Sequence, residues 1–162
     1  MKSLIVYSTQ TDNTKKLAYA IHASIQGEKE ISFVSDAPDP EGYDFVAVGF
    51  WLMAGKPDPK AAAYLEKLAE DQVVFLFATH GAAKGSEHAR QAMQVARDMA
   101  AGASVIGTYS CQGEVNSKVL AKVKAKPQPP VWLDDTATAT GHPDEKDLAE
   151  LKALVAALPL NR

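Results

Sequence analysis

The chain has 162 residues, of which 46% are hydrophobic and 23% charged, and its formal net charge is −3. This size and apolar content predict a single globular domain over residues 1–162 with a sizeable core. The mild negative charge gives no basic field for nucleic acid or for an anionic membrane, so we expect neither partner. One cysteine excludes an internal disulfide, and the N-terminal apolar run is too short for a signal peptide or a membrane span. We therefore expect a cytoplasmic monomer.

Apolar patterning alternates between strands and helices along the chain. The first strand is expected at 3–7, followed by a helix at 13–26 whose apolar residues recur at helical spacing. Later elements are strands at 30–34, 44–50, 73–78 and 104–110 and helices at 58–70, 86–101, 116–125 and 143–157. Nearly continuous apolar strands require burial on both faces of a parallel sheet. The fold class is therefore α/β, a three-layer sandwich with helices on both faces of the sheet.

A hydroxyl-rich loop connects the first strand to the first helix. It contains four hydroxyls and two amides within seven residues, namely Ser8, Thr9, Gln10, Thr11, Asp12, Asn13 and Thr14. These groups lie beside the free N–H groups of a helix start, a combination that suits a phosphate monoester. An ordinary strand-to-helix connection would need only one capping side chain, so the loop predicts a phosphate site.

The segment 9–14 resembles the phosphate loop of flavodoxins, in which a Ser/Thr-x-Thr-Gly-x-Thr pattern follows the first strand. Asp12 stands where the family has glycine. Asp is among the residues that tolerate a left-handed backbone, and a carboxylate beside a phosphate costs about 1 kcal/mol in water unless it points away. The resemblance implies a flavodoxin-like sheet of five parallel strands in the order 2-1-3-4-5, with FMN bound outside the strand ends near the switch between strands one and three.

The loops after strands three and four would hold the flavin ring of such a site. After strand three, the resemblance places Phe50, Trp51 and Leu52 at the ring, where Trp51 either stacks on the flavin or packs as core. After strand four, Thr79, His80 and Gly81 would follow the ring edge, and glycine there allows a close backbone approach. His80 either contacts the flavin or is a solvated loop histidine.

The loop after strand five, Cys111-Gln112-Gly113, resembles a turn found in short flavodoxin-like proteins and would lie at the same edge. Cys111 either contacts the flavin or is a small buried hydrophobic residue. Beyond it, the lysines near 116–125 form a solvated face, and Trp132 with Leu133 either covers the site or anchors the long connection 127–142. No pair of histidines has metal-ligand spacing, so no metal site is expected.

No general base, nucleophile or substrate-activating cluster is evident in the sequence. The chain is identified as a member of the flavodoxin family, which implies an FMN-binding electron-transfer protein that works between a reductase and an acceptor enzyme. Two alternatives remain open. One is a small FMN-dependent reductase that acts on an acceptor such as a quinone in a pocket formed by Trp51, Cys111 and Trp132. The other is a flavodoxin-like scaffold that has lost FMN binding through Asp12.

Overall fold

A parallel sheet forms the centre of the computed structural model, which describes residues 1–160. Its strands are β1 (Lys2–Tyr7), β2 (Glu28–Phe33), β3 (Phe45–Met53), β5 (Val73–His80) and β6 (Ser104–Gln112). They lie in the order β2-β1-β3-β5-β6, and every neighbouring pair is parallel. The predicted order of the five parallel strands is therefore confirmed. A sixth strand, β4 (Lys56–Pro57), pairs antiparallel with the end of β3 and was not predicted.

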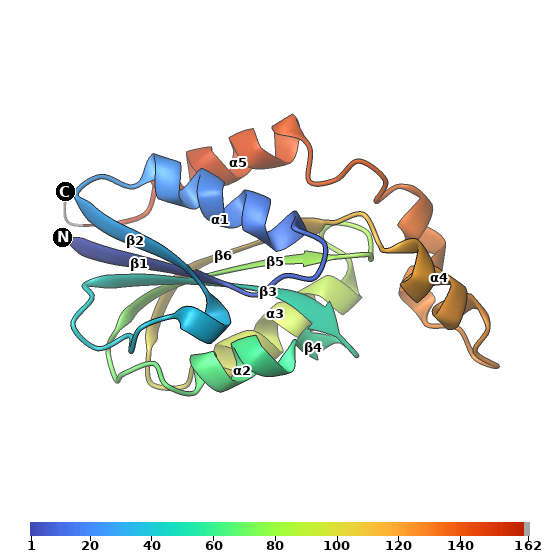
Figure 1. Ribbon diagram of the computed structural model, residues 1–162, viewed down its shortest axis with the longest axis horizontal. Coiled ribbons are helices and arrows are strands. Elements are labelled where there is room, and N and C mark those ends of the chain that lie inside the picture. Colours follow the sequence, from blue (N-terminus) through green and yellow to red (C-terminus); the bar gives the residue numbers. More distant parts are fainter. Residues whose placement is uncertain (161–162) are drawn as a thin grey trace.

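Helices cover both faces of the sheet (Figure 1). Helices α1 (Asn13–Ser24) and α5 (Glu145–Ala156) lie on one face, and α2 (Pro59–Leu65) and α3 (Glu87–Met99) on the other. Successive strand residues alternate between the two cores, so that Ile5 packs under α1 and α5 while Leu4 packs on the α2 and α3 side. Burial on both faces explains the continuous apolar strands. None of the described helices is long and apolar enough to cross a membrane.

Strand β3 extends further than the sequence predicted. The residues Trp51, Leu52 and Met53, expected in a loop, continue the strand and pair with β4 through a tight turn at Ala54 and Gly55. Both turn residues have positive φ, 52° and 75°. The apolar tip of β3 is thus part of a hairpin with a fixed direction, which holds its side chains in place beside the strand ends.

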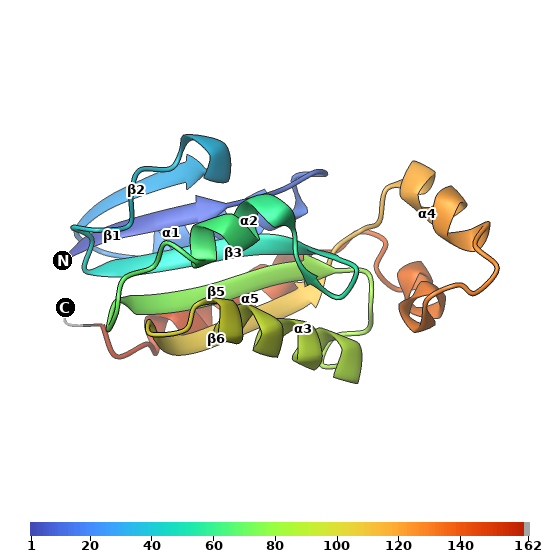
Figure 2. The ribbon, with the colours of Figure 1, turned by 90° about the horizontal axis from the view of Figure 1, so that it is seen from below.

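Residues 114–142 form a lobe that extends beyond the carboxyl edge of the sheet (Figure 2). It contains α4 (Ser117–Lys124) and the 3-10 helix η2 (Val131–Ala137), which lies inside the predicted long connection. Another short 3-10 helix, η1 (Val34–Asp36), follows β2. The lobe is attached by the Ala83 N–H, which donates to Asp135 Oδ2 at 2.9 Å, and by Gln112 Nε2, which donates to Thr138 Oγ1 at 3.0 Å.

Candidate functional site

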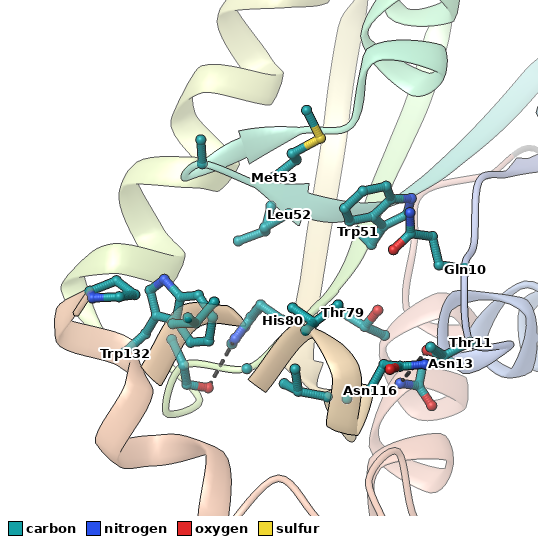
Figure 3. A pocket seen from close by; sticks show the side chains of 18 of the residues that line it. Gln10, Thr11, Asn13, Trp51, Leu52, Met53, Thr79, His80, Asn116 and Trp132 are labelled. Atoms are coloured by element: carbon teal, nitrogen blue, oxygen red, sulfur yellow. Dashed lines mark hydrogen bonds between the residues drawn. The ribbon is translucent and has the colours of Figure 1, made fainter. Parts of the chain in front are cut away.

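A cavity of about 560 Å³ opens between the carboxyl ends of the strands and the lobe (Figure 3). This volume falls in the range of about 300–1,000 Å³ that is typical of small-ligand sites. Eleven of the sixteen residues predicted for the site line it: Thr9, Gln10, Thr11, Asn13, Thr14, Trp51, Leu52, Thr79, His80, Gly81 and Gly113. The other five, Ser8, Asp12, Phe50, Cys111 and Gln112, are not part of its wall.

One end of the cavity, which we call the phosphate end, is formed by Thr9, Gln10, Thr11, Asn13 and Thr14. The buried Asn13 amide donates to Thr11 Oγ1 at 3.0 Å and to the Glu114 carbonyl at 2.9 Å. The Thr14 and Thr79 hydroxyls are 2.9 Å apart and bond to each other. Because Thr11 Oγ1 accepts from Asn13, its own proton remains available to a ligand. With the free N–H groups in the first turn of α1, this arrangement is suited to an anion.

Asp12 has the left-handed backbone that a glycine would adopt at this position. Its φ is 65°, it is exposed, and its side chain makes no capping hydrogen bond to α1. The preceding Ser8 is buried, and its hydroxyl donates to Asp58 Oδ1 at 2.8 Å, where Asp58 caps α2. Ser8 therefore connects the loop to α2, while Asp12 supplies the turn into α1.

The other end of the cavity, which we call the lobe end, lies where the strand ends meet the lobe. Trp51 and Leu52 line the cavity from the β3 hairpin, across from His80 and Trp132 in the view of Figure 3. Gly81 is closely packed, since an added Cβ would lie 2.8 Å from Val115 Cγ2 and 3.3 Å from Trp132 Cε3. The lobe thus rests directly on the β5 loop, and Trp132 both anchors it and lines the cavity.

His80 is buried at the lobe end with only 6% of its surface exposed, so it is not a solvated loop histidine. Its Nδ1 lies 3.0 Å from the Ala82 carbonyl, which can only accept, so Nδ1 carries the proton. Burial lowers the pKa of His80 to about 4, which keeps the ring neutral at pH 7. Its Nε2 is then an acceptor, and it has no partner among the described residues. A buried acceptor without a hydrogen bond costs about 1–3 kcal/mol, and a ligand N–H that donates to Nε2 would remove this cost.

Three of the residues absent from the wall support it from behind. Cys111 is fully buried beside the α1 and α5 core, and burial raises the pKa of its thiol to about 12. Of the two alternatives for Cys111, a flavin contact or a small buried hydrophobic residue, the structure supports the second. Phe50 is fully buried in the core on the α2 and α3 side. Gln112 holds the lobe through Thr138 and the Asp135 carbonyl.

The sequence did not predict most of the wall that the lobe contributes. The lobe residues lining the cavity are Glu114, Val115, Asn116, Val119, Val123, Lys126, Gln128, Pro130 and Trp132. Val115, Val119 and Val123 are spaced four residues apart in the sequence, and this helix-like spacing was the signal that could have identified them as part of a wall. The sequence could not show which surface this short stripe covers.

His142, Asp144 and Asp147 bring three possible metal-ligand atoms within 4.8 Å of one another. The group also has a structural role. His142 Nδ1 lies 2.6 Å from Asp147 Oδ2, and Asp144 and Asp147 form a reciprocal capping box at the start of α5. These contacts explain why the three side chains lie together, since they cap the start of α5.

Comparison with known proteins agrees with this geometry. The model of the flavodoxin domain family matches residues 4–156. The chain belongs to the flavodoxin domain family. It is 34% identical to BilS, a flavodoxin-like domain-containing protein of Clostridioides difficile (strain CD3), over 93% of this chain and 92% of the relative.

Solved structures share the fold of this flavodoxin-family chain. A flavodoxin of Streptococcus pneumoniae TIGR4 superposes with a TM-score of 0.62 at 10% identity, over 96% of this chain and 95% of the other. A Lactobacillus acidophilus NCFM flavoprotein in complex with FMN gives a TM-score of 0.55 at 19% identity, over 67% and 92% of the two chains. Family membership supports flavin binding.

Proposed function

We propose that this chain binds FMN noncovalently and carries electrons between a reductase and an acceptor enzyme, as a cytoplasmic monomer. The observation that carries the proposal is the phosphate end, where Asn13 and Thr14 are fixed by contacts within the protein and Thr11 keeps a free donor. Such a preformed anion site suits the phosphate of FMN. The FMN complex of the Lactobacillus flavoprotein, a neighbour in fold, is consistent with this choice.

The lobe end suits the flavin ring. Trp51 and Leu52 offer a flat apolar wall, and His80 Nε2 is a buried acceptor for a ligand N–H. The flavin ring carries an N–H group, so its orientation would be set by the phosphate at one end and by this acceptor at the other. FMN supplies the electron-transfer chemistry when bound, and the protein binds it, orients it and excludes water from it.

The apolar lobe wall favours one alternative, a reductase that acts directly on a small acceptor. Val119, Val123 and Trp132 line the cavity from the lobe and would give such an acceptor an apolar place beside the ring. Cys111 is not part of that pocket, because it is fully buried beneath the wall. Steady reduction of a quinone with NAD(P)H and this protein alone would support the reductase over the carrier.

The experiment is a parallel titration of the apo-protein with FMN and with riboflavin, followed by flavin fluorescence. Tight, quenched FMN binding and much weaker riboflavin binding are expected, because the two ligands differ in the phosphate. Electrochemical reduction of the complex should then show two separate one-electron steps, as a one-electron carrier requires. Equal affinity for both flavins would contradict the phosphate assignment, and no binding of either would favour the scaffold without FMN.

A further inference from the structure

One segment of the lobe, residues 115–133, carries a charge opposite to that of the rest of the chain. Residues 115–133 contain the four lysines Lys118, Lys122, Lys124 and Lys126 and no acidic residue. The chain has a formal charge of −3, so a segment of +4 leaves −7 for the remaining residues. All four lysine side chains are exposed, and none forms an ion pair with another described residue. A concentrated cationic surface therefore stands on an otherwise acidic protein.

Exposed apolar side chains accompany these lysines. Val131, at the start of η2, is 92% exposed, and Val119 on α4 is 39% exposed. Across the opening, Met53 at the tip of the β3 hairpin is 46% exposed. Large apolar groups with surrounding charges are typical of protein–protein interfaces, in which an apolar centre is bordered by a polar rim.

The same surface lies at the opening of the cavity. Met53, Val119 and Lys126 each line the cavity and are also exposed, so they mark its mouth. The lobe extends outward from this mouth, beyond the edge of the sheet (Figure 2). A protein bound to the lobe would therefore meet the cavity directly, which is the position that electron transfer to or from a bound flavin requires.

We propose that the lysine segment of the lobe, residues 115–133, with Met53 opposite, is the docking surface for an electron-transfer protein whose own contact surface is acidic. The proposal rests on the proposed function and names the chemistry of the partner. Opposite charges steer two proteins together and fix their orientation, and the apolar groups at the centre then stabilise the contact. The acidic remainder of the chain directs an acidic partner away from its other faces and toward the lobe.

Charge distribution favours a protein over a nucleic acid or a membrane. A duplex or a lipid surface is anionic well beyond the width of one short helix, so the acidic remainder of this chain opposes its approach through like-charge repulsion. A protein can present an acidic patch that matches the lobe alone. The acidic residues of the lobe, Glu114, Asp134 and Asp135, lie outside the lysine segment in the sequence and border it on both sides.

The test uses the full chain, labelled with nitrogen-15, in the presence and absence of FMN. Three probes are added in turn: a plant-type ferredoxin as an acidic electron-transfer protein, mitochondrial cytochrome c as a basic one, and phosphatidylcholine vesicles with and without phosphatidylserine. We expect ferredoxin to shift or broaden amide signals of residues 115–133 and of Met53, and to lose this effect as salt is raised. Cytochrome c should leave these signals unchanged.

Charge variants supply the matched controls. Lys118→Glu with Lys122→Glu should raise the ferredoxin dissociation constant at least tenfold at low ionic strength, and the two Gln substitutions should raise it by about threefold. Neither lysine lines the cavity, so FMN affinity should remain unchanged in both variants. The control pair, Lys67→Glu with Lys152→Glu, makes the same charge change outside the lobe at two exposed positions and should change the constant less than about twofold.

The outcomes separate this inference from the proposed function. Ferredoxin shifts confined to the lobe, together with unequal effects of the two charge-reversed pairs, support the docking surface. The inference is overturned if ferredoxin shifts no lobe signals, if both pairs weaken binding equally, or if only the phosphatidylserine vesicles bind the lobe. Failure of the FMN titration would instead overturn the proposed function, and the signals measured without FMN would still report on docking.

Discussion

At the phosphate end of the cavity, the buried side chains Asn13, Thr14 and Thr79 bond to other parts of the protein, whereas at the lobe end His80 Nε2 has no protein partner. The first end is therefore organised before a ligand arrives, and the second keeps an unmet hydrogen-bonding demand. We therefore propose different tasks for the two ends: the first fixes an anion, and the second selects what lies next to it.

The largest expected effect tests the buried histidine of the lobe end. Because the folded-state pKa of His80 is lowered to about 4 from 6.5, the unfolded chain takes up a proton between these pH values and the folded chain does not. This site should therefore reduce the free energy of unfolding progressively as the pH falls from 6.5, by about 3 kcal/mol at pH 4. Urea unfolding at several pH values measures the slope.

His80→Asn is the matched variant for that measurement, since the Asn side-chain amide can still donate to the Ala82 carbonyl but does not titrate. Its unfolding free energy should depend less on pH across the same window. Identical pH slopes for the wild type and the variant would show that His80 is not a buried neutral histidine.

The next effect tests the phosphate end. Thr11→Ala removes a hydroxyl that accepts from Asn13 and has a proton free for the ligand. We expect FMN affinity to fall by about 1–3 kcal/mol, the range for loss of a charge-assisted hydrogen bond, while riboflavin affinity stays the same. Calorimetric titration with both flavins measures the difference. A similar loss for riboflavin would mean that Thr11 acts on the shape of the loop and makes no contact with phosphate.

A third change tests whether the lobe is seated on the β5 loop. Gly81→Ala places a Cβ 2.8 Å from Val115 Cγ2, so the lobe must shift, at a cost of about 1–2 kcal/mol in stability for an overpacked contact. Gly81→Ala combined with Val115→Ala removes the clashing methyl and should recover part of the loss. Thermal unfolding compares the single and double variants. If the second substitution adds to the loss with no recovery, the two residues are not in contact.

The smallest effect concerns Asp12, which has a left-handed backbone at the phosphate end. Asp12→Gly should relieve that conformation and remove a carboxylate near the anion site, so FMN affinity should increase by about 1 kcal/mol. Raising the salt concentration should reduce the difference between wild type and variant, because the carboxylate is exposed. A salt-independent gain would assign the effect to the backbone alone.

Sequence reasoning was most successful where a residue's role depends on its neighbours in the chain. The phosphate loop follows from hydroxyls and amides at a helix start, and the left-handed turn at Asp12 follows from its position in that loop. The five parallel strands follow from apolar runs, since only a sheet buried on both faces accommodates them. At β3 the same reasoning ended the strand too early, because the pairing of Leu52 with Pro57 depends on a hairpin that is set by two positive φ angles.

The sheet and the loop that builds the phosphate end could be predicted from the chain, because they depend on local spacing and on the periodicity of apolar residues, and the family resemblance supplied the strand order. Three other contacts became evident from the folded protein alone: Ser8 bonds to Asp58, Cys111 is buried beneath the wall, and Trp132 packs against Gly81. Such contacts depend on how separate elements pack in space, and no local pattern encodes which surfaces will meet.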